Sequence, residues 1–117
     1  MNEDDIYATI LDSAFGLSLG AIWQHLGVEV SGCDMSYLQR KELFLRIMGR
    51  LLSDGWVKLA REGELLAGDS YGQLELLRTA WPNDPGADDL DGFGHWFLID
   101  APAGVVWIAE DGVELWT

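Results

Sequence analysis

The chain has 117 residues, about the commonest length of a single domain, and 49% of them are hydrophobic, so we expect one packed core rather than disorder. Seven Lys and Arg stand against twenty Asp and Glu, and the net charge of −13 argues against an ordinary binder of nucleic acid or of an anionic membrane. The lone Cys33 excludes an internal disulfide and, with the acidic start and the lack of a long apolar run, favours a cytoplasmic location.

Two short helices are predicted at the start of the chain. Apolar residues recur at helical spacing between Ile6 and Ala14, behind three acids that suit the N-terminal end of a helix, and Gly16 is the predicted stop. Ser18 is the predicted N-cap of a second helix, and Gly27 is its predicted left-handed stop.

The third helix has the strongest signal. Ser36 and Gln39 form a capping-box pattern, an apolar stripe follows, and Gly55 is the predicted stop. Glu42 precedes Arg46 by four residues, which favours an ion pair within the helix.

A short ribbon and a fourth helix follow. Residues 56–60 and 65–66 are predicted strands around a turn at Glu62-Gly63. Ser70 is the predicted N-cap of the fourth helix, which Pro82 closes because proline cannot continue the hydrogen-bond ladder.

The last part of the chain changes from helical to strand-like spacing. Residues 82–94 are polar and predict a long acidic loop, and strands are expected at 95–100, 105–109 and 113–116, with a tight turn at Asp111-Gly112. The predicted fold is a single α+β domain over 1–117: a bundle of three to four helices with a short ribbon near 56–66, followed by a three-stranded antiparallel β-meander.

The charges are segregated along the chain. Residues 1–39 carry −6, residues 40–78 carry +1 and hold every base, and residues 79–117 carry −8. The acidic final third is either a solubilising surface or a docking surface for a cationic partner. Of the six Trp, we expect Trp96 and Trp107 to face the core, and Trp81 and Trp116 to be partly exposed anchors for a partner.

Catalytic and metal-binding signals are weak. His25, His95 and Cys33 are too few for a Cys-rich zinc site, and no nucleophile, phosphate-loop or metalloprotease motif occurs. The acids of the 82–94 loop match a calcium loop only in part. We therefore expect neither an enzyme nor a cofactor, with a small hydrolase or a metal-binding domain as the remaining alternative of that class.

A second alternative is a winged-helix or DNA-mimic regulator. The third helix carries several bases and is followed by the 56–66 ribbon, which is the layout of a winged helix-turn-helix. Its bases would have to be available for phosphates, whereas the rest of the chain would repel DNA.

Three stretches resemble the C-terminal signature of a small bacterial family of unknown function. They are Thr-Ala-Trp-Pro-Asn-Asp at 79–84, Gly-His-Trp-Phe-Leu-Ile-Asp at 94–100, and Ala-Gly-Val-Val-Trp-Ile-Ala-Glu-Asp-Gly at 103–112. Some members of that family resemble immunity proteins of contact-dependent growth inhibition. The resemblance implies a cognate toxin as partner, and it carries over no catalytic motif.

Charge and resemblance together predict an immunity protein that binds one-to-one to a basic toxin domain, such as the C-terminal nuclease domain of a large secreted effector, and binds neither nucleic acid nor membrane. The expected contacts are one aromatic anchor and seven acids: Trp81, Asp84, Asp88, Asp89, Asp91, Glu110, Asp111 and Glu114.

Overall fold

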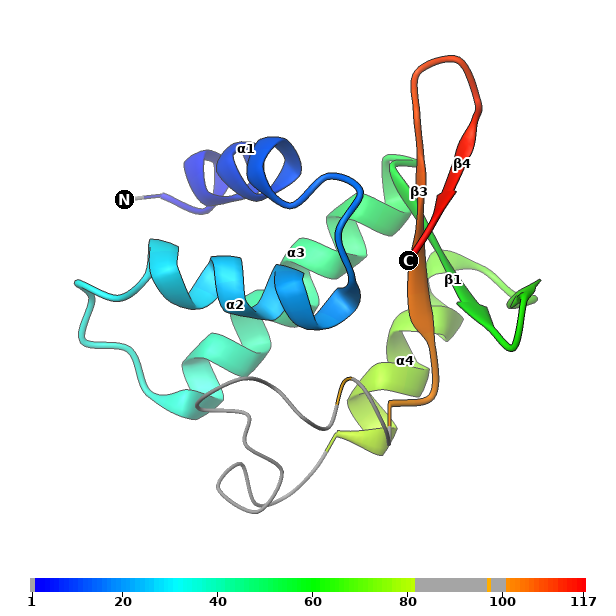
Figure 1. Ribbon diagram of the computed structural model, residues 1–117. Coiled ribbons are helices and arrows are strands. Elements are labelled where there is room, and N and C mark those ends of the chain that lie inside the picture. Colours follow the sequence, from blue (N-terminus) through cyan, green and yellow to red (C-terminus); the bar gives the residue numbers. More distant parts are fainter. Residues whose placement is uncertain (1, 82–96, 98–100) are drawn as a thin grey trace.

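Within residues 2–81, 97 and 101–117, which the computed structural model describes, four helices and four strands form an α+β fold (Figure 1). The helices are α1 (Glu3–Ser13), α2 (Leu19–Glu29), α3 (Tyr37–Ser53) and α4 (Ser70–Ala80), and the strands are β1 (Val57–Arg61), β2 (Glu64–Leu65), β3 (Gly104–Ile108) and β4 (Glu114–Trp116). The predicted fold class is thus confirmed, with β1 and β2 placed between α3 and α4.

Local capping signals set the helix starts. Ser18 caps α2, and Ser36 and Gln39 form the predicted capping box at α3. At α4 the cap is Asp69, whose carboxylate accepts the Gly72 N–H at 2.8 Å, so the prediction of Ser70 was one residue late.

Gly27 does not end α2, contrary to the sequence prediction. The helix continues to Glu29, and Val30 is its C-cap. Gly27 instead permits a close approach, because a Cβ at this position would lie 2.6 Å from Nη2 of Arg40.

The sheet has the order β2-β1-β3-β4, and every pair is antiparallel. Lys58 of β1 pairs with Val106 of β3, so strands that precede and follow α4 are neighbours at the centre of the sheet. The predicted 56–66 ribbon is therefore part of the same sheet as the last strands. Of the strand expected at 95–100 the structure describes Phe97 alone, which has helical backbone, and the rest of that predicted strand lies outside the described residues.

One face of the sheet packs against the helices. Val57, Leu59, Val105 and Trp107 alternate onto this face and are almost fully buried. The indole Nε1 of Trp107 donates to the Leu17 carbonyl at 2.8 Å, which fixes the α1–α2 turn to the sheet. The expectation that Trp107 faces the core is confirmed.

Buried Gln73 on α4 completes the edge of β1 beyond the two-residue strand β2. Its Oε1 accepts the Leu59 N–H at 3.4 Å, and its Nε2 donates to the carbonyls of Leu66 and Gly68 at 3.2 and 3.1 Å. The Gln73 side chain thus takes the place of the backbone groups with which a longer β2 would have paired the edge of β1.

Candidate functional site

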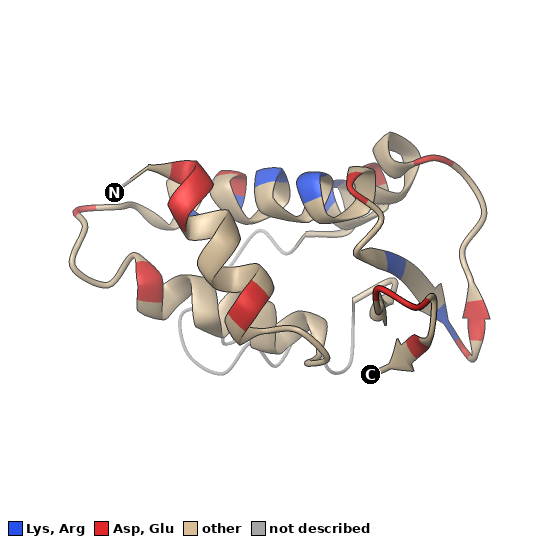
Figure 2. Cartoon of the chain, turned by 90° about the horizontal axis from the view of Figure 1, so that it is seen from above, with Lys and Arg blue, Asp and Glu red and all other residues tan. Residues whose placement is uncertain are grey.

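The β3–β4 hairpin presents the described acids of the final third of the chain. Glu110, Asp111 and Glu114 are all exposed, and the sequence has no Lys or Arg from residue 79 onward. The turn holds them in a defined geometry: the Gly112 N–H donates to the Ala109 carbonyl at 2.8 Å, and Gly112 has a φ of 85°, which glycine adopts without strain. Figure 2 shows this hairpin with acids only.

Apolar side chains lie beside these acids. Trp116 is 47% exposed, as expected from the sequence, and Val113 and Leu115 of the same hairpin are exposed too. Leu115 lies next to the α1–α2 turn: a Cβ built on Gly16 of that turn would be 4.0 Å from Leu115 Cδ1. Leu17 of the same turn is also exposed. Apolar anchors bordered by charge are typical of protein contact surfaces.

Three arginines of α3 and α4 pair with acids of the helices. Arg46 bonds Glu3 at 2.7 Å and Arg50 bonds Asp4 at 2.9 Å, so α3 is tied to the start of α1. Arg78 of α4 bonds Glu42 at 2.9 Å. The predicted Glu42–Arg46 pair within α3 was therefore wrong, because each partner finds an opposite charge on another helix.

Within the described residues, the three hairpin acids take part in no ion pair. Glu114 accepts the Trp116 indole N–H at 3.1 Å and Asp111 accepts the Val113 N–H at 3.1 Å, so these two carboxylates have local polar partners. The charge of the hairpin is thus presented outward, whereas that of the α1 acids is offset by arginines.

The bases of α3 are engaged inside the molecule. Beyond the ion pairs of Arg46 and Arg50, the Arg40 guanidinium stacks 3.8 Å from the Trp23 ring centre and donates to the Trp23 carbonyl at 2.9 Å. Lys41 lies over the Trp81 ring at 5.9 Å. This arrangement does not favour α3 as a DNA-reading helix, which needs its bases at phosphates and base edges.

Trp81 is a core residue, and the prediction of a partly exposed anchor was wrong. It is 6% exposed, its Nε1 donates to the Tyr37 hydroxyl at 2.5 Å, and its ring packs against Trp23 and Phe44. The packing of α4 against α3 brings Trp81 into this aromatic cluster. The predicted contacts Asp84, Asp88, Asp89 and Asp91, and also Trp96 and His95, lie outside the described residues.

A tyrosine–carboxylate contact that the sequence did not reveal joins α1 to the end of α3. The Tyr7 hydroxyl donates to Asp54 at 2.6 Å, and the Arg50 guanidinium lies 3.9 Å from the Tyr7 ring centre. Burial, followed by the hydrogen bond and the charge of Asp54, raises the pKa of Tyr7. Tyr7 therefore stays protonated as the donor for Asp54.

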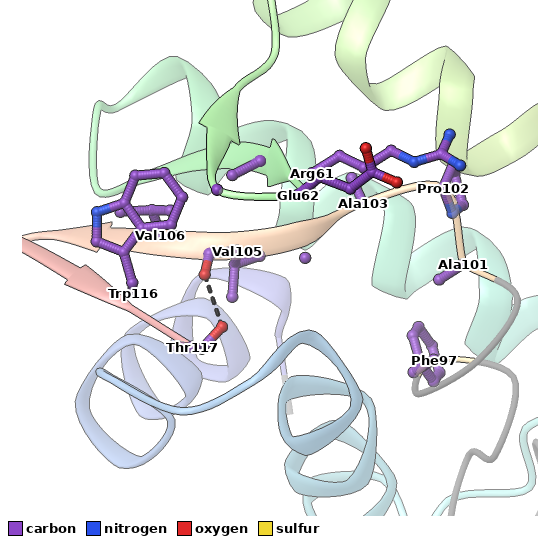
Figure 3. A pocket seen from close by; sticks show the side chains of 13 residues that line it. Arg61, Glu62, Phe97, Ala101, Pro102, Ala103, Val105, Val106, Trp116 and Thr117 are labelled. Carbon is purple, nitrogen blue, oxygen red and sulfur yellow. Dashed lines mark hydrogen bonds between the residues drawn. The ribbon is translucent and has the colours of Figure 1, made fainter.

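An open hollow of about 270 Å³ lies where β1, β3 and β4 meet (Figure 3). Thr117 Oγ1 donates to the Val105 carbonyl at 2.6 Å at its wall. Among the described residues, Arg61 and Glu62 are the only ones with a charged side chain that line the hollow.

The described candidates for nucleophilic or metal chemistry are separate. His25 Nδ1 lies 3.0 Å from Ser13 Oγ, between α1 and α2, and Cys33 is exposed in the turn before α3. No three His, Cys, Asp or Glu side chains among the described residues are grouped to hold a metal ion. Similarly, no described helix combines the length and the apolar character that a bilayer crossing requires.

Comparison with known proteins gives a family and a solved fold. The family described as "Protein of unknown function, DUF596" matches residues 52–117, which include all four strands and α4. A solved structure of an uncharacterised protein conserved in bacteria, from Neisseria meningitidis, has a TM-score of 0.82 and 26% identity, over 97% of this chain and 88% of that chain. No curated protein matches. Because the family match covers more than half of its length, this chain belongs to the DUF596 family.

Proposed function

We propose that this protein is an immunity protein, which binds a cognate basic toxin domain one-to-one inside the producing cell and neutralises it. The toxin is the C-terminal nuclease domain of a large secreted effector. The observation that carries the proposal is the β3–β4 hairpin, which presents exposed Glu110, Asp111 and Glu114 beside exposed Trp116 with no base nearby in the sequence. The sequence resemblance to immunity proteins of contact-dependent growth inhibition supports the same function.

The charge of the hairpin addresses the first need of such an inhibitor, which is speed. A nuclease binds a polyanion and is therefore basic around its substrate. An acidic surface attracts it over a distance and raises association rates toward about 10⁸–10⁹ M⁻¹s⁻¹ at low salt.

The apolar side chains address the second need, which is a slow dissociation. Trp116, Leu115 and Val113 expose apolar surface at the same hairpin, and burying it against the toxin removes that surface from water. Large aromatic anchors contribute most of the affinity at interfaces, mainly through the dissociation rate. Inhibition then follows from occupying the toxin surface and requires no chemistry by this protein.

The first experiment tests protection. Cells producing a C-terminal toxin domain from a large secreted effector of the same bacterium are compared with and without co-expression of this protein, and the purified pair is measured by stopped-flow binding. We expect rescue of growth and an association rate that falls steeply as salt rises.

A second experiment assigns the steering to the hairpin. In one variant Glu110→Gln, Asp111→Asn and Glu114→Gln remove three charges while keeping the acceptor oxygens toward Val113 and Trp116. The matched control, Asp12→Asn, Asp34→Asn and Glu64→Gln, removes three exposed charges elsewhere.

The hairpin variant should associate roughly tenfold more slowly at low salt, with a weaker salt dependence, and the control should change little. Equal effects of the two variants would mean that only net charge matters and would remove the hairpin from the proposal. Toxicity unaffected by co-expression, with no complex between the purified proteins, would refute the proposed function.

A further inference from the structure

The outer edge of β4 has backbone groups without a strand partner among the described residues. β4 is the last strand in the order β2-β1-β3-β4, so it is hydrogen-bonded to a strand on one side. The Val113 carbonyl accepts the Ala109 N–H at 2.9 Å, and Leu115 pairs with Trp107 of β3. Because successive residues of a strand direct their backbone groups to opposite sides, those of Glu114 and Trp116 face away from β3.

The side chains along this edge form two different faces. Glu114 and Trp116 lie on the outer face of the sheet, where Trp116 is across from Val106 and, beyond it, Lys58. Leu115 lies on the opposite face, at the margin of the core beside the turn that carries exposed Leu17. A strand added at this edge would therefore meet a charged and aromatic face on one side and an aliphatic face on the other.

We propose that the toxin contributes an extended basic segment that pairs with the outer edge of β4 as a fifth strand of the sheet. This inference rests on the proposed function and specifies how its partner is recognised. The backbone groups of Glu114 and Trp116 supply the register, and side chains opposite β4 supply the selectivity. The segment carries Lys or Arg across from Glu114 and an apolar residue across from Leu115.

Charge favours this occupant over a second copy of the chain. Exposed strand edges are commonly protected by Lys or Pro, and β4 has neither. It has instead the acids Glu110, Asp111 and Glu114 on its own hairpin. Edge-to-edge pairing of two copies would bring these like charges together, which is unfavourable, whereas a basic strand would bring opposite charges together.

Amide hydrogen exchange tests the pairing residue by residue. The ¹⁵N-labelled protein is measured alone and in complex with the toxin domain made catalytically inactive. In the isolated protein the amides of Glu114 and Trp116 should exchange rapidly, and that of Leu115 should be protected by β3. In the complex the amides of Glu114 and Trp116 should slow at least tenfold, and Leu115 should change less.

A pair of variants separates the backbone from the side chain. Glu114→Pro removes an outward N–H, and Glu114→Gln removes the same charge while keeping that N–H. We expect the proline variant to bind the toxin at least tenfold more weakly than the glutamine variant. Should the proline variant fail to fold, the exchange pattern alone decides the matter.

The outcomes separate this inference from the function on which it rests. A tight complex in which Glu114 and Trp116 still exchange rapidly overturns the strand pairing and leaves the proposed function standing. Protection of these amides that grows with protein concentration in the absence of toxin assigns the edge to a second copy and also overturns it. Absence of any complex refutes the proposed function itself.

Discussion

Replacing Gln73 by leucine should destabilise the protein by about 2 kcal/mol. The substitution keeps the volume approximately and removes the acceptor for Leu59 and the donor to Leu66 and Gly68. The Leu59 N–H is then left unpaired inside the structure, at a cost of about 1–3 kcal/mol. The two carbonyls can regain water at about 0.5 kcal/mol each, and burial of the leucine returns about 1 kcal/mol.

Chemical denaturation measures this loss. For a domain of this size, 2 kcal/mol corresponds to a fall in melting temperature of roughly 8 °C, with an unchanged denaturant slope. Thr79→Leu, at an exposed position of the same helix, is the control and should stay within about 0.5 kcal/mol. A loss below 0.5 kcal/mol for Gln73→Leu, with the Leu59 amide exchanging as slowly as before, would refute the role given to this side chain.

Further predictions concern the Tyr7 contact, an ion pair and two tryptophans. The folded protein raises the pKa of Tyr7 above its unfolded value of about 10, so the stability that the Tyr7–Asp54 contact contributes is present below pH 10 and falls as the pH rises further. Tyr7→Phe should lower the free energy of unfolding by about 1 kcal/mol at pH 7. In denaturation curves measured at alkaline pH, the variant should lose less stability than the unchanged protein. Arg78→Gln should cost about 1 kcal/mol at low salt and less in 1 M NaCl, and an effect independent of salt would count against the ion pair. Trp116→Ala should leave thermal stability nearly unchanged and weaken toxin binding at least tenfold, by about 1.4 kcal/mol, in calorimetry. Trp81→Phe should do the reverse, lowering stability by about 1–2 kcal/mol with little effect on affinity; loss of affinity without loss of stability would restore Trp81 as a contact.

The parts of the fold that depend on neighbouring residues were predictable from the sequence. The capping box at Ser36 and Gln39 and the left-handed glycines Gly55 and Gly112 were confirmed, because the chemistry of each turn lies within a few residues. Gly27 carried the same local signal for the end of a helix, and there the prediction failed. Glycine stands at this position because Arg40 approaches closely, and Arg40 belongs to a helix further along the chain.

Partners distant in sequence were not predictable. An i,i+4 pair such as Glu42–Arg46 contributes only a few tenths of a kcal/mol, so tertiary packing readily redirects both residues, here to Arg78 and Glu3. The burial of Trp81 was missed for the same reason, because its neighbour Phe44 lies on another helix.

For the candidate site, the sequence indicated the charge and exposure of the hairpin side chains but not how the strands around them are ordered. The exposure of Trp116 and the acidity of the hairpin were expected, and both follow from composition and position. The predicted meander also placed the last strand at an edge, but the pairing of β1 with the other side of β3 was not expected. Strand order is a non-local property that one sequence does not display.

The pairing of β1 with β3 has a consequence for the time at which the protein becomes competent during synthesis. These strands are separated by α4 and the long segment after it, so β1 emerges from the ribosome well before its central neighbour exists. Such long-range contacts form slowly and only after the intervening chain is made. Under the proposed function, nascent chains should therefore give no protection against a toxin until synthesis has passed β4, and premature termination within the last hairpin should abolish protection.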